Sequence, residues 1–76
     1  MILYVKFLTG ERLEIDVEPS NNVVEMKQKI HDLNNQPVEL MKLVYKGQIL
    51  KDHGMVVDYK IQSKEFIVCC LTRHPI

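Results

Sequence analysis

One segment of the chain has the hydrophobic spacing of a helix, and the segments around it alternate as strands do. Between Asn22 and Asn35 the apolar residues recur at steps of three and four, which places them on one helical face: Val23, Met26, Ile30 and Leu33. Asn22 is a suitable N-cap, and Glu25 follows three residues later, where a carboxylate completes a capping box. Asn34 and Asn35 favour the left-handed conformation that ends helices, and Pro37 prevents continuation. A helix of about three turns is marginal in water, so the rest of the chain must cover its apolar face.

The apolar positions outside this segment alternate with polar ones, as in half-buried strands. This alternation predicts strands over residues 1–7, 11–17, 41–45, 48–50 and 65–72. Turn signals at Thr9-Gly10 and Lys46-Gly47 separate neighbouring strands, so the first two strands should form a β-hairpin. Residues 51–60 carry loop signals, with one predicted turn of 3₁₀ helix near residues 56–59.

These elements predict an α+β architecture. One sheet laid across one helix would bury the apolar faces of both, and the long connection after the hairpin allows the first and last strands to be parallel neighbours. We therefore predict one domain over residues 1–72, with a mixed four- to five-stranded sheet packed on one α-helix plus a short 3₁₀ turn, and a tail or the start of a linker over residues 73–76. The expected core residues are Leu3, Val5, Leu13, Ile15, Val17, Val23, Met26, Ile30, Leu43, Leu50, Val56, Ile61, Ile67 and Cys69.

Composition argues against several classes of function. The chain has 76 residues, 46% of them hydrophobic, and its ten basic residues balance ten acidic ones. This balance gives no basic surface for general nucleic-acid binding, and no apolar run approaches the length of a membrane span. The two cysteines, Cys69 and Cys70, are adjacent, so a disulfide between them would be strained, and a reducing cytosolic or nuclear compartment fits best.

The residues that could carry chemistry show no catalytic or metal-binding pattern. His31, His53 and His74 lack ligand spacing with the cysteines. Ser20 and Ser63 have neither a glycine elbow nor a nearby base. We predict no enzymatic activity, no metal and no other cofactor.

The order of motifs along the chain resembles ubiquitin. The chain opens with MILYVKFLTG, matching MxxxVKxLTG, and VEPS occupies residues 17–20. The further identities are Lys27, Lys29, Ile30, Asp32, Pro37, Leu43, Gly47, Leu50, Asp52, Asp58, Tyr59, Ile61, Gln62 and Leu71. This resemblance covers residues 1–72 and implies the ubiquitin-like β-grasp fold. Residues 47–50, 58–61 and 66–72 are further similar to the N-terminal ubiquitin-like domain of proteasome-shuttle and excision-repair accessory proteins.

The departures from ubiquitin indicate a domain that is not conjugated to other proteins. Ubiquitin-type modifiers end in Gly-Gly, whereas this chain has His74-Pro75-Ile76 there and no glycine after Gly54. The resemblance therefore implies an interaction domain that docks its parent protein on proteasomal or other ubiquitin receptors in the cytoplasm and nucleus. The alternative, a covalent modifier or its precursor, is disfavoured by the missing glycines.

The resemblance places ubiquitin's recognition surface on four residues, which we call the hydrophobic patch: Leu8, Val44, Val68 and Cys70. Strand alternation alone predicts that Val44, Val68 and Cys70 point outward. Such exposed apolar residues either bind a partner or have no function, and alternation does not decide between the two. The resemblance favours binding. Other residues expected at this surface are Lys6, Lys42, Gly47, Gln48 and Ile49. With Lys46 as a further cation, the expected partners are short amphipathic helices edged with acids, and a second class is ubiquitin-associated domains. The domain itself is expected to be a monomer.

Four residues outside the hydrophobic patch also carry expectations. The resemblance implies a structural ion pair between Lys27, on the apolar side of the helix, and Asp52. We place Phe7 in the hairpin loop. There its side chain could either widen the hydrophobic patch or pack locally on the loop, and the sequence supports both roles about equally. Met41 is expected to fill the core.

Overall fold

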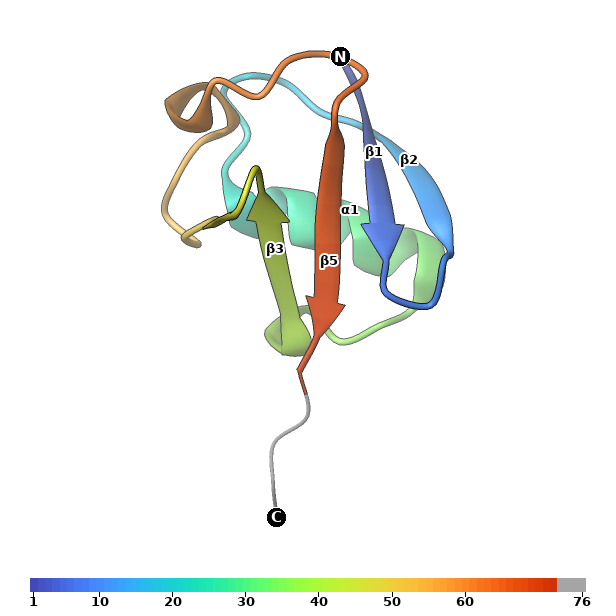
Figure 1. Cartoon of the computed structure of the whole chain (residues 1–76). Coiled ribbons are helices and arrows are strands. Elements are labelled where there is room, and N and C mark those ends of the chain that lie inside the picture. Colours follow the sequence, from blue (N-terminus) through green and yellow to red (C-terminus); the bar gives the residue numbers. More distant parts are fainter. Residues whose placement is uncertain (73–76) are drawn as a thin grey trace.

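The computed structural model describes residues 1–72, in which one sheet lies across one helix (Figure 1). The strands are β1 (Ile2–Phe7), β2 (Arg12–Asp16), β3 (Met41–Tyr45), β4 (Gln48–Ile49) and β5 (Phe66–Leu71), and the helix is α1 (Val23–Asn34). Two 3₁₀ helices, η1 (Val38–Leu40) and η2 (Val56–Tyr59), occupy the connections. The expectation of a tail or linker falls on residues 73–76, which lie outside the described residues.

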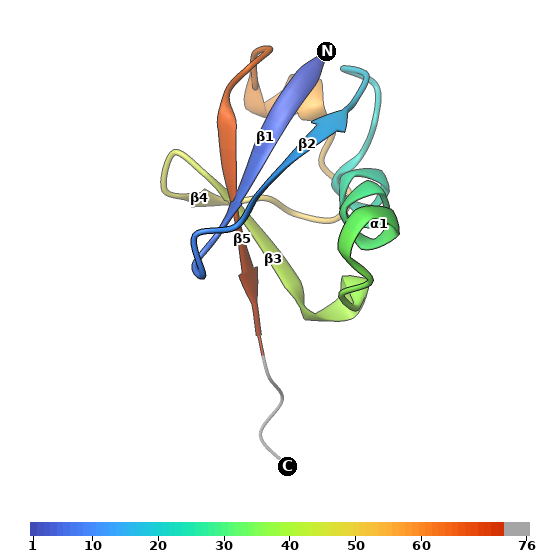
Figure 2. The same cartoon turned by 90° about the vertical axis from the view of Figure 1, so that its right-hand side faces the viewer.

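The five strands form one mixed sheet in the order β2-β1-β5-β3-β4. β1 and β5 are parallel, as predicted, and the other neighbouring pairs are antiparallel. α1 packs against one face of this sheet (Figure 2). The predicted α+β β-grasp architecture is confirmed, and its central strand is the last one along the chain.

The predicted caps of α1 are present. The Asn22 side chain accepts a hydrogen bond from the Glu25 backbone N–H at 2.8 Å, and the Asn22 N–H donates to the Glu25 carboxylate at 3.1 Å. Asn35 ends the helix with φ = 60°, the left-handed conformation that asparagine tolerates. These contacts satisfy backbone groups that would otherwise lack partners at both ends.

The predicted apolar stripe of α1 is wrong at its last member. Val23, Met26 and Ile30 are fully buried, but Leu33 is 56% exposed. At about 100° per residue, Leu33 lies only about 20° around the helix from the buried Met26, so its angular position does not explain its exposure. It stands in the last turn, beside the edge strand β2 and beyond the cover of the sheet.

The buried core follows the predicted inward positions, with one partial exception and, beyond the expected Met41, two additions. Leu13 is only partly buried. Phe7, Met41 and Tyr45 are all buried, and Met41 fills the core as expected. Both interpretations of Phe7 are wrong: β1 continues through Phe7, which keeps the inward parity of Leu3 and is only 6% exposed.

Two predicted hairpin turns have the backbone conformation that their residues favour. Gly10 has φ = +93°, in the connection from β1 to β2. Lys46 and Gly47 have φ = 51° and 79°, so both central residues of the β3–β4 turn are left-handed, as a two-residue type I′ turn requires. In the described part of the chain, no helix combines the length and hydrophobicity needed to cross a membrane.

Candidate functional site

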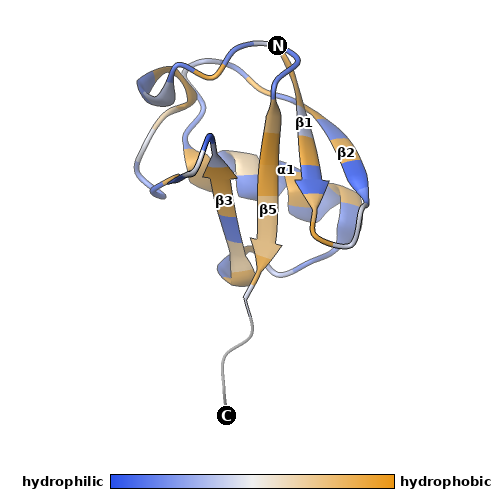
Figure 3. Ribbon diagram, viewed as in Figure 1, coloured by the Kyte–Doolittle hydropathy of each residue, from blue (hydrophilic) through white to orange (hydrophobic). Residues whose placement is uncertain are grey.

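The central strand β5 carries apolar side chains on both of its faces. Ile67 and Cys69 point into the core, whereas Val68 and Cys70 lie on the face turned away from α1. In the hydropathy colouring β5 is mostly hydrophobic, and its neighbours β1 and β3 carry hydrophilic bands (Figure 3). No second layer of the described chain covers this outer face, so its apolar atoms contact water or a partner.

The strand register brings the predicted residues into rows across the outer face. Val68 lies opposite Val44 on β3 and opposite Lys6 on β1. Val44 in turn lies opposite Ile49 on the edge strand β4. Because directly opposed residues share a face of the sheet, these four side chains form a row with a cation at one end and a 54% exposed isoleucine at the other.

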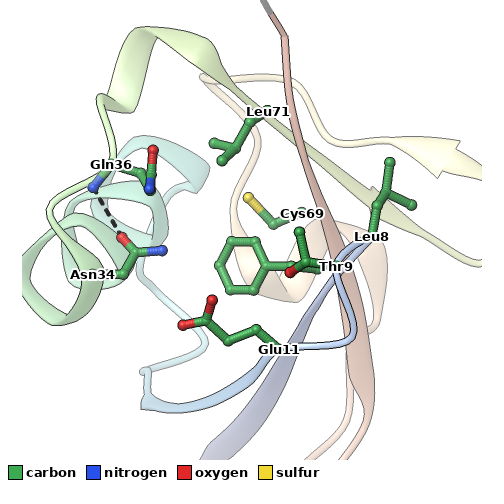
Figure 4. A pocket seen from close by; sticks show the side chains of 8 residues that line it. Leu8, Thr9, Glu11, Asn34, Gln36, Cys69 and Leu71 are labelled. Carbon is green, nitrogen blue, oxygen red and sulfur yellow. Dashed lines mark hydrogen bonds between the residues drawn. The ribbon is translucent and has the colours of Figure 1, made fainter.

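The next row completes the hydrophobic patch. Cys70 lies opposite Lys42, and both point outward. Leu8 follows β1, which runs parallel to β5, and it is 81% exposed. The hydrophobic patch therefore spans β3, β5 and the connection after β1. Leu8 also lines a hollow of about 230 Å³ that is separate from the outer face: it lies on the α1 side of the sheet, between the β1–β2 connection and the end of α1, and Cys69 and Leu71 line it too (Figure 4).

Two of the remaining predicted residues lie at the β3–β4 turn and differ in orientation from Ile49. Gly47 is exposed within the turn itself. Gln48 lies opposite Tyr45, so it belongs to the other face of β4 from Ile49. The structure thus groups Ile49 with the hydrophobic patch, whereas Gln48 stands at the sheet edge with its side chain on the opposite face.

A polar network beside this turn was not predicted from the sequence. The Tyr45 hydroxyl donates a hydrogen bond to Glu65 at 2.6 Å, and the backbone N–H of Gln62 donates to the same carboxylate oxygen at 2.9 Å. Lys46 Nζ lies 3.6 Å from the other oxygen of Glu65. Positions 45 and 65 are distant in sequence, and only the inward parity of Tyr45 hinted that its hydroxyl needs a buried partner.

This network changes the charges around the hydrophobic patch. The hydrogen bond from Tyr45, followed by that from the Gln62 backbone, lowers the pKa of Glu65, and the same Tyr45–Glu65 bond raises the pKa of Tyr45. Glu65 therefore stays ionised and pairs with Lys46. Lys6 and Lys42 form no ion pair with any described residue, so both cations remain available to a partner.

The adjacent cysteines occupy different environments, and both are free thiols. Cys69 is 1% exposed, and burial raises its pKa to about 11. Cys70 is half-buried on the outer face. Strand alternation thus places one thiol in the core and the other within the hydrophobic patch.

Lys27 is the one buried charged residue among those described, at 9% exposed. Its Nζ lies 2.7 Å from Asp52 Oδ1, in the loop before η2, and the Asp52 side chain is 55% exposed. This pair connects the middle of α1 to the loop before η2, in which the Gly54 carbonyl also accepts a hydrogen bond from the Val23 N–H at the start of α1. Among the described residues, no three His, Cys, Asp or Glu side chains are placed to hold a metal ion.

Comparisons with known proteins agree with this architecture. Residues 3–74 match the family described as the Ubiquitin family. The UV excision repair protein rhp23 of Schizosaccharomyces pombe is 41% identical over 74 residues, covering 96% of this chain and 20% of that protein. The UV excision repair protein RAD23 homolog B of Bos taurus and that of Homo sapiens are each 34% identical over 76 residues, covering 96% of this chain and 19% of each relative. The chain thus spans about a fifth of the length of these relatives, its resemblance to ubiquitin-like domains of excision-repair proteins is confirmed, and it belongs to the ubiquitin family.

Proposed function

We propose that this chain is a non-conjugated ubiquitin-like interaction domain that docks the protein containing it on proteasomal or other ubiquitin receptors. The observation that carries the proposal is the uncovered apolar face of the central strand. Val44 and Val68 are paired across β3 and β5, and they lie on the face of the sheet turned away from α1, which among the described residues is the one α-helix.

The partner that fits this face is a short amphipathic helix with acids at its edges. Its apolar stripe would cover Val44, Val68 and Cys70, with Leu8 and Ile49 at the two sides. Lys6 and Lys42 would face its carboxylates, which steers association more than it adds affinity. Ubiquitin-associated domains, which are small helical domains, are the second partner class that this surface suits.

The relatives compared above are UV excision repair proteins. We infer that the parent protein of this domain works in the same context, in the cytoplasm and nucleus, and that the domain itself acts as a monomer and without catalysis. Residues 73–76, RHPI, contain none of the glycines that ubiquitin-type conjugation requires, which supports docking over covalent attachment.

The test is a titration of the isotope-labelled chain with a synthetic amphipathic helical peptide that carries a Leu/Ala stripe and flanking glutamates. A contact this small should give micromolar affinity, about −8 kcal/mol. Val44→Ala should weaken binding by about 1–2 kcal/mol, because this side chain lies in the middle of the row. Amide shifts should cluster on β3, β5 and the β1–β2 connection.

The matched control is Val57→Ala, the same substitution on η2 at a 54% exposed position away from β3 and β5. It should leave the affinity unchanged. Shifts clustered on α1, or equal affinities for the two variants, would remove the hydrophobic patch as the docking site.

A further inference from the structure

An exposed aromatic pair extends the outer face of the sheet beyond the hydrophobic patch. Tyr4 on β1 lies opposite Phe66 on β5, and their ring centroids are 5.2 Å apart at an angle of 31°. Phe66 is 48% exposed. A ring pair left half in water at the end of the central strand adds little to the core, so its apolar surface is available to a partner.

The aromatic pair is continuous with the hydrophobic patch. Phe66 and Val68 are two residues apart on β5 and lie on the same face, about 7 Å apart along the strand. Cys70 stands another two residues on, so these three side chains form an unbroken apolar line along β5.

A hollow of about 510 Å³ lies beside the aromatic pair. Tyr4, Phe66, Arg12, Leu13 and Glu14 line it. Arg12 lies opposite Lys6 on β1, and it forms no ion pair with any described residue. The hollow therefore presents an aromatic wall with the Arg12 guanidinium and the Glu14 carboxylate beside it, and Arg12 is the lining group that would pair with a partner's carboxylate next to an apolar side chain.

Resting on the proposed function, we propose that the docking helix runs along β5 past the hydrophobic patch, places an apolar side chain on Tyr4 and Phe66, and directs a carboxylate toward Arg12. The line from Cys70 to Phe66 is about 13 Å long, which a helix spans in about nine residues. The step from Val68 to Phe66 is about 7 Å of this line, so the aromatic pair selects partners whose amphipathic segment is about five residues, a little more than one turn, longer than contact with Val44 and Val68 alone would need.

The experiment compares three synthetic peptides, one short and two long, on the 76-residue chain by calorimetry and amide shifts. The short peptide carries one Leu/Ala stripe with flanking glutamates. The long peptides add about five residues, including a leucine and a glutamate, at the N-terminal end in one version and at the C-terminal end in the other. One long version should bind about three- to tenfold more tightly than the short peptide, with new shifts at Tyr4 and Phe66.

Phe66→Ala should remove this gain while leaving the affinity for the short peptide unchanged, and Phe66→Leu should keep part of it. Arg12→Gln should reduce the gain in affinity for the long peptide that carries the added glutamate. It should not change the gain for a long peptide in which glutamine replaces this glutamate. Leu33→Ala, at an exposed aliphatic residue on α1, is the matched control and should change neither affinity.

If the short peptide binds but neither long version gains affinity, this inference fails while the proposed function stands. If the short peptide itself does not bind, the proposed function fails. Self-association of the chain that Phe66→Ala abolishes, with no gain for a long peptide, would assign the aromatic pair to a contact between two copies and overturn the proposal.

Discussion

Replacing Ile30 with alanine tests the packing of α1 on the sheet. Ile30 is fully buried and lies on the same helical face as Val23 and Met26. Removing its outer carbons loses burial and leaves a cavity, which costs about 2–5 kcal/mol. A domain of 76 residues has a total stability of about 4–11 kcal/mol, so the variant should be close to unfolding. A loss of about 3 kcal/mol should lower Tm by roughly 12–24 °C.

Leu33→Ala is the control, because it truncates an aliphatic side chain on the same helix, one turn later. The sequence pattern gives Leu33 the same role as Ile30, but the structure leaves it 56% exposed. Its replacement should change the free energy of unfolding by no more than about 0.5 kcal/mol.

Urea denaturation followed by circular dichroism separates the two variants. With a slope of about 1 kcal/mol/M for so small a domain, the midpoint should fall by about 2 M or more for Ile30→Ala and stay within about 0.5 M for Leu33→Ala. Equal shifts for both variants would show that α1 is rotated from the orientation described here. An unchanged midpoint for Ile30→Ala would refute the packing of this face altogether.

The other predictions concern reactivity, pH dependence and conjugation. Iodoacetamide should alkylate Cys70 in the native state and Cys69 only on unfolding, since burial raises the pKa of Cys69 to about 11; equal native rates by mass spectrometry would contradict the β5 register. The Tyr45 hydrogen bond lowers the pKa of Glu65 below its ordinary 4.5 in the folded state, so ionised Glu65 stabilises the fold. This contribution to the free energy of unfolding is fully present above pH 4.5, and it is lost as the pH falls through the lower pKa of the folded state. Thermal melts of Tyr45→Phe should therefore show a flatter acid limb, and an unchanged limb would exclude the network as its source. Incubation with a ubiquitin-activating enzyme and ATP should give no thioester, because residues 73–76 lack glycine, and a thioester band on a non-reducing gel would refute this.

Local sequence signals predicted the elements well because each depends on neighbouring residues. The capping box of Asn22 and Glu25 and the left-handed Asn35 are set within one or two turns of helix. Strand alternation correctly assigned the inner and outer faces of β1, β3 and β5. From these faces alone, Val44 and Val68 could be placed on the outward side, and pairing of β3 with β5 makes them neighbours.

The features that sequence reasoning missed depend on where elements end against one another. Leu33 continues the helical spacing, but the sheet stops at β2 before it reaches this turn. Phe7 has the inward parity of β1, but its position close to the Thr9-Gly10 turn suggested that it belongs to the loop. The structure extends β1 through Phe7 and so places its side chain in the core. The contact of Tyr45 with Glu65 joins residues 20 positions apart and requires the three-dimensional arrangement.

The central position of β5 connects the fold to the proposed function. β5 lies between β1 and β3 in the middle of the sheet, and α1 covers one face of this sheet only. Apolar residues on the covered face of β5 therefore stabilise the fold by burial. Val68, Cys70 and Phe66 on the other face consequently contribute less to folding than Ile67 and Cys69 do. Stability and binding should therefore separate along one strand: truncating an outward residue should weaken docking with little effect on unfolding, and truncating an inward one should unfold the domain.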